Sequence, residues 1–220
     1  MNLLRRAGHL AGQAWLGLTA GSSGDYWEKR YRLGMNSGSG SIGELARFKA
    51  DVLNAHVQEQ GIQSVIEFGC GDGLQLALAS YPSYVGLDVS QTAVRLCASR
   101  FAGDATKSFL WYEESQSGNL AGYLQADLTL SLDVIYHLLE DDVYWRYLRN
   151  LFGCSRRQVI VYSSNRDERE FARHVKHRRF VDDVRAEFPA FSLVRTLENP
   201  LRDRSFADFF FFSRDGAPVA

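Results

Sequence analysis

The stretch SVIEFGCGDG, Ser64 to Gly73, decides the fold, because a short apolar run ends directly in three glycines at alternate positions. The run SVIEF is typical of a buried strand, and Gly69, Gly71 and Gly73 give the following turn unusual backbone freedom. A strand that leads into a glycine-rich turn and then a helix lets backbone N–H groups approach a ligand closely. The stretch therefore predicts a ligand-binding turn at the end of a strand.

The rest of the chain alternates between segments with strand character and segments with helix character. Strands are predicted at 63–68, 84–87, 108–112, 127–132 and 157–163, and two more at 191–197 and 206–213 have no clear helix between them. Helices are predicted at 74–79, from Ser90 onward, near 141–152, and from the capping-box sequence SIGE, Ser41 to Glu44, to Gly61. This alternation predicts an α/β fold with a doubly wound, seven-stranded, mostly parallel sheet and an antiparallel C-terminal hairpin.

Composition argues against several classes of protein. The 220 residues carry a formal net charge of -1, with 45% hydrophobic and 23% charged residues, so the chain has no overall basic field for nucleic acid. The three cysteines, at positions 70, 97 and 154, show neither a CxxC nor a zinc spacing. This usage favours a reducing, cytoplasmic location without disulfides, and it predicts no metal site.

The first 24 residues differ from the rest of the chain. Apolar and small residues repeat there at helical spacing: Leu3, Ala7, Leu10, Ala14 and Leu18. No apolar run approaches the length that spans a bilayer. We interpret residues 1–24 as an amphipathic helix and a hinge, GSSG at 21–24, which docks on the domain, on a partner or, less readily, on a membrane surface. Residues 25–220 are then expected to form the main domain.

A carboxylate ends the second predicted strand. Asp88, in VGLDVS, follows Gly69 by about 20 residues, the spacing at which an acid grips the two ribose hydroxyls of a nucleoside cofactor. The glycine turn, the strand and Asp88 together predict an adenosine-type pocket at the switch point of the sheet, against the alternative of a purely structural turn. The dehydrogenase fingerprint GxGxxG would require glycine at Leu74, which disfavours a nicotinamide cofactor.

The pattern E-x-G-x-G-x-G, with Glu67 before the first glycine, resembles the first motif of the class I S-adenosylmethionine-dependent methyltransferases. YVGLDVS, SLDVIYHL and the terminal hairpin are similar to later motifs of that family, in the family's order. The segment DYWEKRY, Asp25 to Tyr31, resembles an aromatic and basic segment that covers the cofactor in many members. The resemblance extends over roughly 24–213, and it implies a Rossmann-like fold with S-adenosylmethionine as the cofactor.

The resemblance also implies a set of cofactor-binding residues. They are Tyr26, Trp27, Arg30, Glu67, Gly69, Cys70, Gly71, Asp72, Gly73, Asp88, Val89 and Asp133. Asp88 would hold the ribose, Glu67 would organise the turn or the cofactor's amino group, and Asp133 would lie near that amine or the transferring methyl. A cap or turn carboxylate is the alternative for Glu67 and Asp133. Glu113 and Glu114, after the third strand, are the candidates for adenine recognition.

The implied reaction is an in-line displacement at the methyl carbon, in which the enzyme chiefly holds the nucleophile and the methyl group in line. A hydroxyl acceptor also needs its proton removed by a general base. His137, after the fourth strand, is the first candidate for that base, and His174 and His177 are alternatives. His137 could equally be a residue that packs beside the pocket.

The segment RDEREFARHVKHRRF, Arg166 to Phe180, lies where members of the family usually recognise their acceptor. Arginine suits carboxylates and phosphates, so we expect a small-molecule or saccharide acceptor with an anionic group. The predicted acceptor-binding residues are Tyr136, His137, Arg173, His177, Arg178 and Arg179. A solvated helix face is the alternative, because acidic residues are interleaved with the basic ones.

The combination of YWEKRY, NSGSGS (Asn36 to Ser41) and HRRF is similar to bacterial methyltransferases associated with surface-polysaccharide synthesis, which implies O-methylation of an acidic sugar. Motifs of DNA methyltransferases are lacking, since Asp133 is followed by Val-Ile-Tyr and no cysteine follows a proline. Two other functions stay open. One is a catalytically silent, cofactor-binding partner subunit; the other is a nicotinamide-dependent oxidoreductase, which Leu74 and the terminal hairpin disfavour.

Overall fold

The computed structural model describes residues 20–113, 118–168 and 174–216. Within these ranges, seven strands form one sheet in the order β3-β2-β1-β4-β5-β7-β6. Neighbours from β3 to β5 pair in parallel, and β7 runs antiparallel to both β5 and β6. The predicted doubly wound sheet with its antiparallel hairpin is confirmed. The strands are β1 (Val65–Phe68), β2 (Tyr84–Asp88), β3 (Lys107–Trp111), β4 (Ala126–Leu132), β5 (Ser155–Ser163), β6 (Phe191–Leu197) and β7 (Asp208–Arg214).

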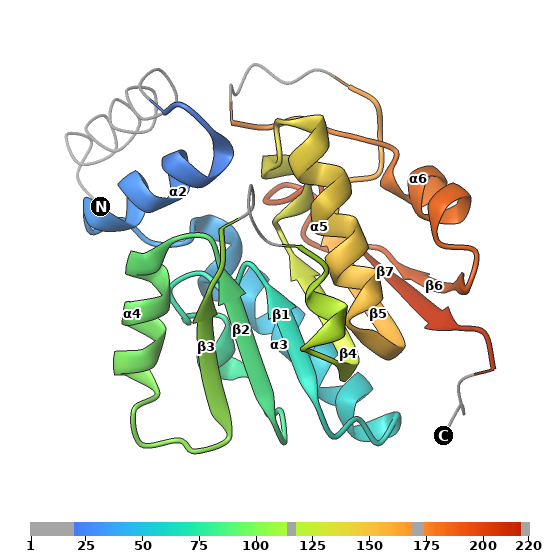
Figure 1. Ribbon diagram of the computed structural model, residues 1–220, viewed down its shortest axis with the longest axis horizontal. Helices are drawn as coiled ribbons and strands as arrows, with labels where there is room; N and C mark the ends of the chain where they lie inside the picture. The colour runs from blue at the N-terminus through green and yellow to red at the C-terminus, as the bar shows by residue number, and fades with distance from the viewer. Residues whose placement is uncertain (1–19, 114–117, 169–173, 217–220) are drawn as a thin grey trace.

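Helices cover both faces of the sheet (Figure 1). Residues of α5 and α6 pack in one apolar cluster with one face of the strands, and residues of α3 and α4 pack in a second cluster with the other face. The helices are α2 (Ser23–Arg32), α3 (Gly43–Glu59), α4 (Gln91–Arg100), α5 (Asp141–Gly153) and α6 (Phe180–Glu187), with short 3-10 turns η1 (Ser39–Ser41), η2 (Leu76–Leu78), η3 (Leu120–Gly122) and η4 (Ile135–His137).

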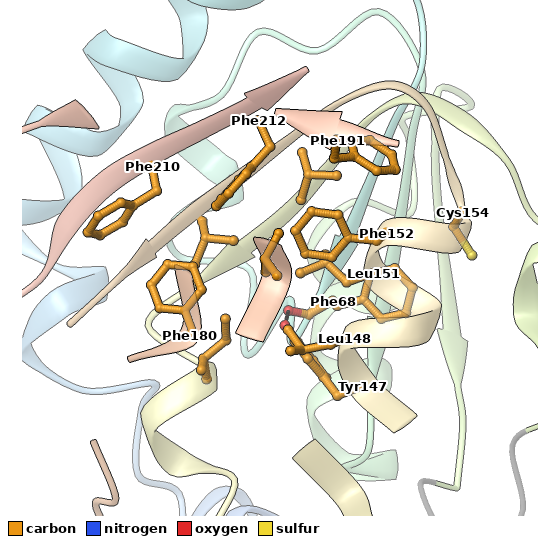
Figure 2. Packing of buried hydrophobic residues seen from close by; sticks show 14 of the residues in the cluster. Phe68, Tyr147, Leu148, Leu151, Phe152, Cys154, Phe180, Phe191, Phe210 and Phe212 are labelled. Carbon is orange, nitrogen blue, oxygen red and sulfur yellow. Dashed lines mark hydrogen bonds between the residues drawn. The ribbon is translucent and has the colours of Figure 1, made fainter. Parts of the chain in front are cut away.

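Strand β7 shows why this sheet needs cover on both sides. Phe210 and Phe212 join the cluster under α5 and α6, whereas Phe209 and Phe211 join the cluster under α3. Figure 2 shows Phe210 and Phe212 close to Phe180 and other aromatic side chains of the first cluster. Alternate side chains of a strand point to opposite faces, so four consecutive phenylalanines are buried without conflict.

Helix α5 also fixes the end of β1, through Tyr147. The hydroxyl of Tyr147 donates to the carbonyl of Phe68 at 3.1 Å and lies 2.7 Å from the hydroxyl of Ser131 (Figure 2 marks Tyr147 and Phe68). Phe68 is the last residue of β1, directly before the glycine turn. The helix therefore holds the turn through the strand that precedes it.

Helix α2 is tied to two loops on opposite sides of the switch point. Its first residue, Ser23, donates through its backbone N–H to Glu140 at 3.0 Å, and its hydroxyl also bonds Glu140. Further along α2, the carboxylate of Glu28 accepts from the Ser90 hydroxyl at 2.6 Å and from the backbone N–H of Thr92 at 3.1 Å. These bonds fasten α2 to the start of α5 and to the start of α4.

Four local predictions need correction or addition. The hinge at 21–24 is wrong for Ser23 and Gly24, which are helical because the Ser22 side chain caps α2 at the N–H of Asp25. The expected helix 74–79 is only the turn η2, because the chain becomes extended at Ala79. The capping box at Ser41 is wrong, since α3 begins at Gly43 with no side-chain cap. Helix α6 was not predicted. The predicted docking helix within 1–19 lies outside the described residues.

The cap of α4 is confirmed, since the Ser90 hydroxyl accepts from the N–H of Ala93 at 3.0 Å. In the described part of the chain, no helix combines the length and the apolar character needed to cross a membrane.

Candidate functional site

A cavity lies where the carboxyl ends of β1, β2 and β4 meet, beside the point where the strand order reverses. Helix α2, the loop before α3 and the segments that follow the three strands form its wall. We call it the switch-point cavity. Of the residues predicted to bind a cofactor, these line it: Trp27, Glu67, Gly69, Cys70, Gly71, Asp88, Val89 and Asp133.

The glycine turn is packed so tightly that a side chain has no room at Gly69 or at Gly71. Gly69 has φ +86°, and a β-carbon there would stand 2.5 Å from Cγ2 of Val134. Gly71 has φ +59°, and its β-carbon would stand 2.4 Å from the hydroxyl oxygen of Ser37. The turn can therefore lie against both the loop before α3 and the loop after β4 only while positions 69 and 71 are glycine.

We expect Gly71→Ala to lower the free energy of unfolding by about 1–2 kcal/mol, because the new methyl group would displace Ser37 and force a left-handed backbone on alanine. Denaturant unfolding measures the change. Gly103→Ala is the matched control, since a β-carbon at Gly103 has no heavy atom within 4 Å. Equal effects at the two positions would contradict the tight packing of the turn.

Asp88 lies at the end of β2 with both carboxylate oxygens engaged by backbone. Oδ2 accepts from the N–H of Gly71 at 2.9 Å, and Oδ1 accepts from the N–H of Ser90 at 2.8 Å. Each oxygen keeps a second lone pair for a ligand. Burial raises the pKa of Asp88 to about 6, against the two backbone bonds, which lower it. Asp88 thus stands where the sequence placed it, with the bonding capacity that two ribose hydroxyls require.

This pKa leads to a pH dependence of ligand binding. A nucleoside whose hydroxyls donate to Asp88 binds the ionised form, so its affinity should fall as the pH drops through about 6, by about tenfold at pH 5 relative to pH 8. Calorimetric titration with S-adenosylhomocysteine across this range tests the effect. Asp88→Asn should bind more weakly at every pH without that step. A step that persists in Asp88→Asn would belong to Glu67 instead, whose pKa burial raises to about 7.

Glu67 and Asp72 hold the framework of the turn. The Tyr84 hydroxyl of β2 donates to Glu67 at 2.6 Å, so this buried acid ties β1 to β2 while it borders the cavity. Asp72 accepts from the backbone N–H groups of Ser37 and Leu74, both at 3.1 Å, and it does not line the cavity. Gly73 likewise lies outside the lining, packed against Phe101 and Cys97. Asp72 and Gly73, both predicted to bind the cofactor, therefore contact the protein around the turn instead of the cavity.

Asp133 directly follows β4 and belongs to a buried ionic group. Its Oδ2 lies 2.6 Å from Nζ of Lys49, whose side chain is 1% exposed, and its Oδ1 accepts from the hydroxyl of Tyr136 at 2.7 Å. The backbone of Asp133 has φ 61°, a costly conformation for a residue other than glycine. Lys49 and Tyr136 hold the carboxylate in this place, at the edge of the switch-point cavity.

A second cavity adjoins the first and shares Trp27, Ser37, Asp133 and His137 with it. We call it the acceptor cavity, because acceptor binding is the role that is proposed for it. Its remaining wall comes from α2, the glycine-serine loop before α3, η4, and two segments near residues 175 and 205. Tyr26, Arg30, Tyr136, His174 and Phe206 are among the residues that line it. Tyr26 and Arg30, predicted to bind the cofactor, thus lie on this second side.

His137 stands in the wall between the two cavities. Its Nδ1 lies 2.8 Å from the carbonyl oxygen of His174, which can only accept, so Nδ1 carries the proton and Nε2 keeps a lone pair. Burial lowers the pKa of His137 to about 4, and the charge of Arg30 contributes in the same direction. The ring is therefore neutral near pH 7, with Trp27 edge-on to it at 5.0 Å and His174 stacked at 5.5 Å.

The basic segment contributes His174 and Val175 to the acceptor cavity, but not the two described arginines that were predicted to bind the acceptor. Arg178 donates to the carbonyl of Leu138 at 2.6 Å and pairs with Asp141 at 2.8 Å, and Arg179 pairs with Asp182 at 2.8 Å on the outside. Neither lines the acceptor cavity, because each is drawn to these partners. His177 is buried, with Nδ1 2.6 Å from the Ser164 hydroxyl. The helix-face alternative is also wrong for 166–168 and 174–179, which are not helical, and Arg173 lies outside the described residues.

Lys49, Gln75 and Tyr112 are among the residues of the switch-point cavity that were not predicted. Lys49 had a readable signal, since it falls between Leu45 and Leu53 on the buried face of α3. Gln75 donates to the carbonyl of Ala46 at 3.0 Å, and its buried Oε1 has no partner among the described residues. Tyr112 follows β3, at the end where adenine recognition was expected. Glu113 lines an adjoining cavity with Val89 and Tyr112, and Glu114 lies outside the described residues.

No protein-family model matches the sequence, and no curated protein matches it. Solved structures do match. Magnesium protoporphyrin IX methyltransferase (ChlM) from Synechocystis PCC 6803, with bound S-adenosylhomocysteine, has a TM-score of 0.65 and 17% identity over 87% of this chain and 97% of that one. The N-methyltransferase NodS from Bradyrhizobium japonicum WM9, also with S-adenosylhomocysteine, has a TM-score of 0.61 and 17% identity over 78% and 87%. The cyclase SpnF has a TM-score of 0.62 and 13% identity over 91% and 98%.

These neighbours define the class of fold. The chain has the class I methyltransferase fold, with the seven-stranded, mostly parallel sheet and the antiparallel C-terminal strand of that architecture.

Proposed function

We propose that the protein transfers the methyl group of S-adenosylmethionine to a hydroxyl group of a small-molecule acceptor. The observation that carries the proposal is the pair of adjoining cavities, one beside Asp88 and the glycine turn, the other beside Tyr136 and His174, with Asp133 and His137 in the wall that they share. A cofactor in the first cavity and an acceptor in the second would meet at that wall. Methyl transfer needs this in-line approach above all.

The residues of the switch-point cavity fit the proposed cofactor. Asp88 offers one lone pair on each carboxylate oxygen to the ribose hydroxyls, and the turn at Gly69 and Gly71 admits a ligand against the backbone. The buried Oε1 of Gln75 borders the same cavity without a donor among the described residues, and an ammonium group would satisfy it. When bound, S-adenosylmethionine supplies a methyl group that its sulfonium charge makes electrophilic.

His137 is the proposed general base. Its Nε2 lone pair is available because the His174 carbonyl fixes the proton on Nδ1, and burial keeps the ring neutral near pH 7. As the acceptor oxygen attacks the methyl carbon, its proton would pass to Nε2. The negative charge of Asp133 favours the imidazolium that results. His177 is a weaker alternative, since it lies outside the acceptor lining. For His174, the other predicted alternative base, we propose the role of orienting His137 through its carbonyl.

His137→Gln should lower kcat about 10²–10⁴-fold, the usual contribution of a general base, and should leave the dissociation constant of S-adenosylhomocysteine within about threefold of the wild type. The measurement is methyl transfer from radiolabelled S-adenosylmethionine to a panel of hydroxyl acceptors that begins with acidic sugars. His56→Gln is the control, since His56 contacts Gln158 and Phe211 away from both cavities. An unchanged kcat in His137→Gln would assign His137 to packing alone.

A silent cofactor-binding subunit is the second candidate. The neighbour SpnF is a cyclase on the same fold, which illustrates that the architecture does not decide the reaction. Parallel titrations with S-adenosylhomocysteine and NADH separate the possibilities: binding of the sulfur cofactor without turnover of any acceptor supports the silent subunit, and binding of NADH alone supports an oxidoreductase. A saccharide acceptor, a role in surface-polysaccharide synthesis and docking through residues 1–24 stay predictions.

A further inference from the structure

One arginine of the acceptor cavity is buried without a counter-ion among the described residues. Arg30 is 3% exposed. Its Nε donates to the carbonyl of Asn36 at 2.8 Å, its Nη1 lies 3.4 Å from the Tyr26 hydroxyl, and its guanidinium lies 5.4 Å from the Trp27 ring. All three partners are neutral, and within the described ranges no carboxylate lies at ion-pair distance from Arg30.

Other arginines near the site are compensated. Arg178, with a side chain 10% exposed, pairs with Asp141 at 2.8 Å. Arg204, at the edge of the acceptor cavity, pairs with Glu44 at 2.7 Å and is half exposed. A charge taken out of water without a partner is costly, so an uncompensated buried cation is expected only where something else supplies the opposite charge. Because Arg30 borders a cavity, a ligand can supply it.

We propose that Arg30 binds an anionic group of the acceptor, a carboxylate, phosphate or sulfate, inside the acceptor cavity. The proposal rests on the proposed function, which assigns that cavity to the acceptor. The reacting hydroxyl and the anionic group would belong to one small molecule, because the Trp27 ring lies 5.0 Å from the His137 ring and 5.4 Å from the Arg30 guanidinium. Among the described residues, Nη2 and the second N–H of Nη1 have no acceptor, and these two nitrogens form the fork that two oxygens of such a group require.

The proposal keeps the anionic acceptor expected from the sequence and changes the residue that recognises it. The sequence placed recognition in the basic segment after β5, at Arg173, Arg178 and Arg179. The structure directs the two described arginines of that set to carboxylates of the chain itself. Arg30 reaches the cavity from the other side, from α2.

The test uses inorganic sulfate and inorganic phosphate as probes on the full chain saturated with S-adenosylhomocysteine, at constant ionic strength, by calorimetry and tryptophan fluorescence. Arg30→Gln should raise the dissociation constant of sulfate at least about tenfold, with a smaller rise for Arg30→Lys, which keeps the charge and loses the fork. Arg178→Gln is the matched control, a buried arginine that already has a carboxylate, and it should leave the constant within about twofold.

Two sources of the anionic group are distinguished by the same titrations. If sulfate competes with S-adenosylhomocysteine, and Arg30→Gln weakens both, Arg30 holds the cofactor's own carboxylate and the proposal is wrong. It is equally wrong if the wild type binds no sulfate, or if Arg30→Gln binds it as the wild type does. If S-adenosylhomocysteine does not bind the wild type at all, the proposed function fails, and sulfate titration without it still tests Arg30.

Discussion

Asp88→Ala should weaken binding of S-adenosylmethionine and S-adenosylhomocysteine about 100-fold or more. Hydrogen bonds to a charged group contribute about 1.5–3 kcal/mol each, and the substitution removes the acceptor for two ribose hydroxyls. It also leaves the N–H groups of Gly71 and Ser90 without their carboxylate partner, so the glycine turn loses one of its anchors. Calorimetric titration of both proteins with S-adenosylhomocysteine measures the loss.

Asp104→Ala serves as the control for Asp88→Ala. Asp104 is a turn residue whose carboxylate also accepts from a backbone N–H, that of Thr106 at 2.9 Å, but it lies far from the lining of either cavity. It should leave the affinity unchanged. An Asp88→Ala protein that is folded and binds S-adenosylhomocysteine with wild-type affinity would remove the cofactor proposal.

Lys49→Met should lower the free energy of unfolding by about 3 kcal/mol or more. The substitution leaves Asp133 as a largely buried anion without its cation, and breaking one side of such a pair is strongly destabilising. Asp133→Asn should be destabilising for the converse reason, since it leaves the buried ammonium of Lys49 without the carboxylate of its ion pair. The double variant should recover much of the loss, because both charges are then gone.

Denaturant unfolding of the two single variants and the double variant gives the coupling energy of the pair directly. The surface pair of Arg146 and Asp142 on α5 is the matched comparison, and Asp142→Ala should cost less than about 1 kcal/mol because solvent screens that pair. Additive effects of Lys49→Met and Asp133→Asn would show that the two side chains do not act as a unit. The methyl-transfer activity of the same variants reports separately on the role of Asp133 in the wall between the two cavities.

The parts of the site that were predictable are those fixed by local sequence. A parallel strand ends where its apolar run ends, so the glycine turn, Asp88 and Asp133 could be assigned to the carboxyl edge of the sheet from the chain alone. The switch point then follows from the alternation of strands and helices. Even the placement of His137 next to the fourth strand is a consequence of chain order.

What the sequence did not reveal depends on contacts between distant segments. Arg178 is withdrawn from the acceptor cavity by a carbonyl and a carboxylate at the start of α5, about 40 residues earlier, and no local pattern shows that partner. Arg30 was expected at the cofactor, because the whole segment DYWEKRY was assigned to cofactor binding. In a helix, however, successive side chains point in different directions, so Tyr31 borders the switch-point cavity whereas Arg30 borders the acceptor cavity. Helix α6 was missed because it is short and follows a basic loop, so its three buried apolar residues, Phe180, Val181 and Val184, did not stand out as a helical pattern.

The two attachments of α2 bear on the rate of turnover. Ser23 is bonded to Glu140 on one flank and Glu28 to Ser90 and Thr92 on the other, while Trp27 and Tyr31 between them wall the switch-point cavity. We expect a ligand in this cavity to exchange when the helix lifts from one flank. The spent cofactor is then expected to leave at a rate set by the undocking of α2, so that a faster chemical step would not by itself make a faster enzyme.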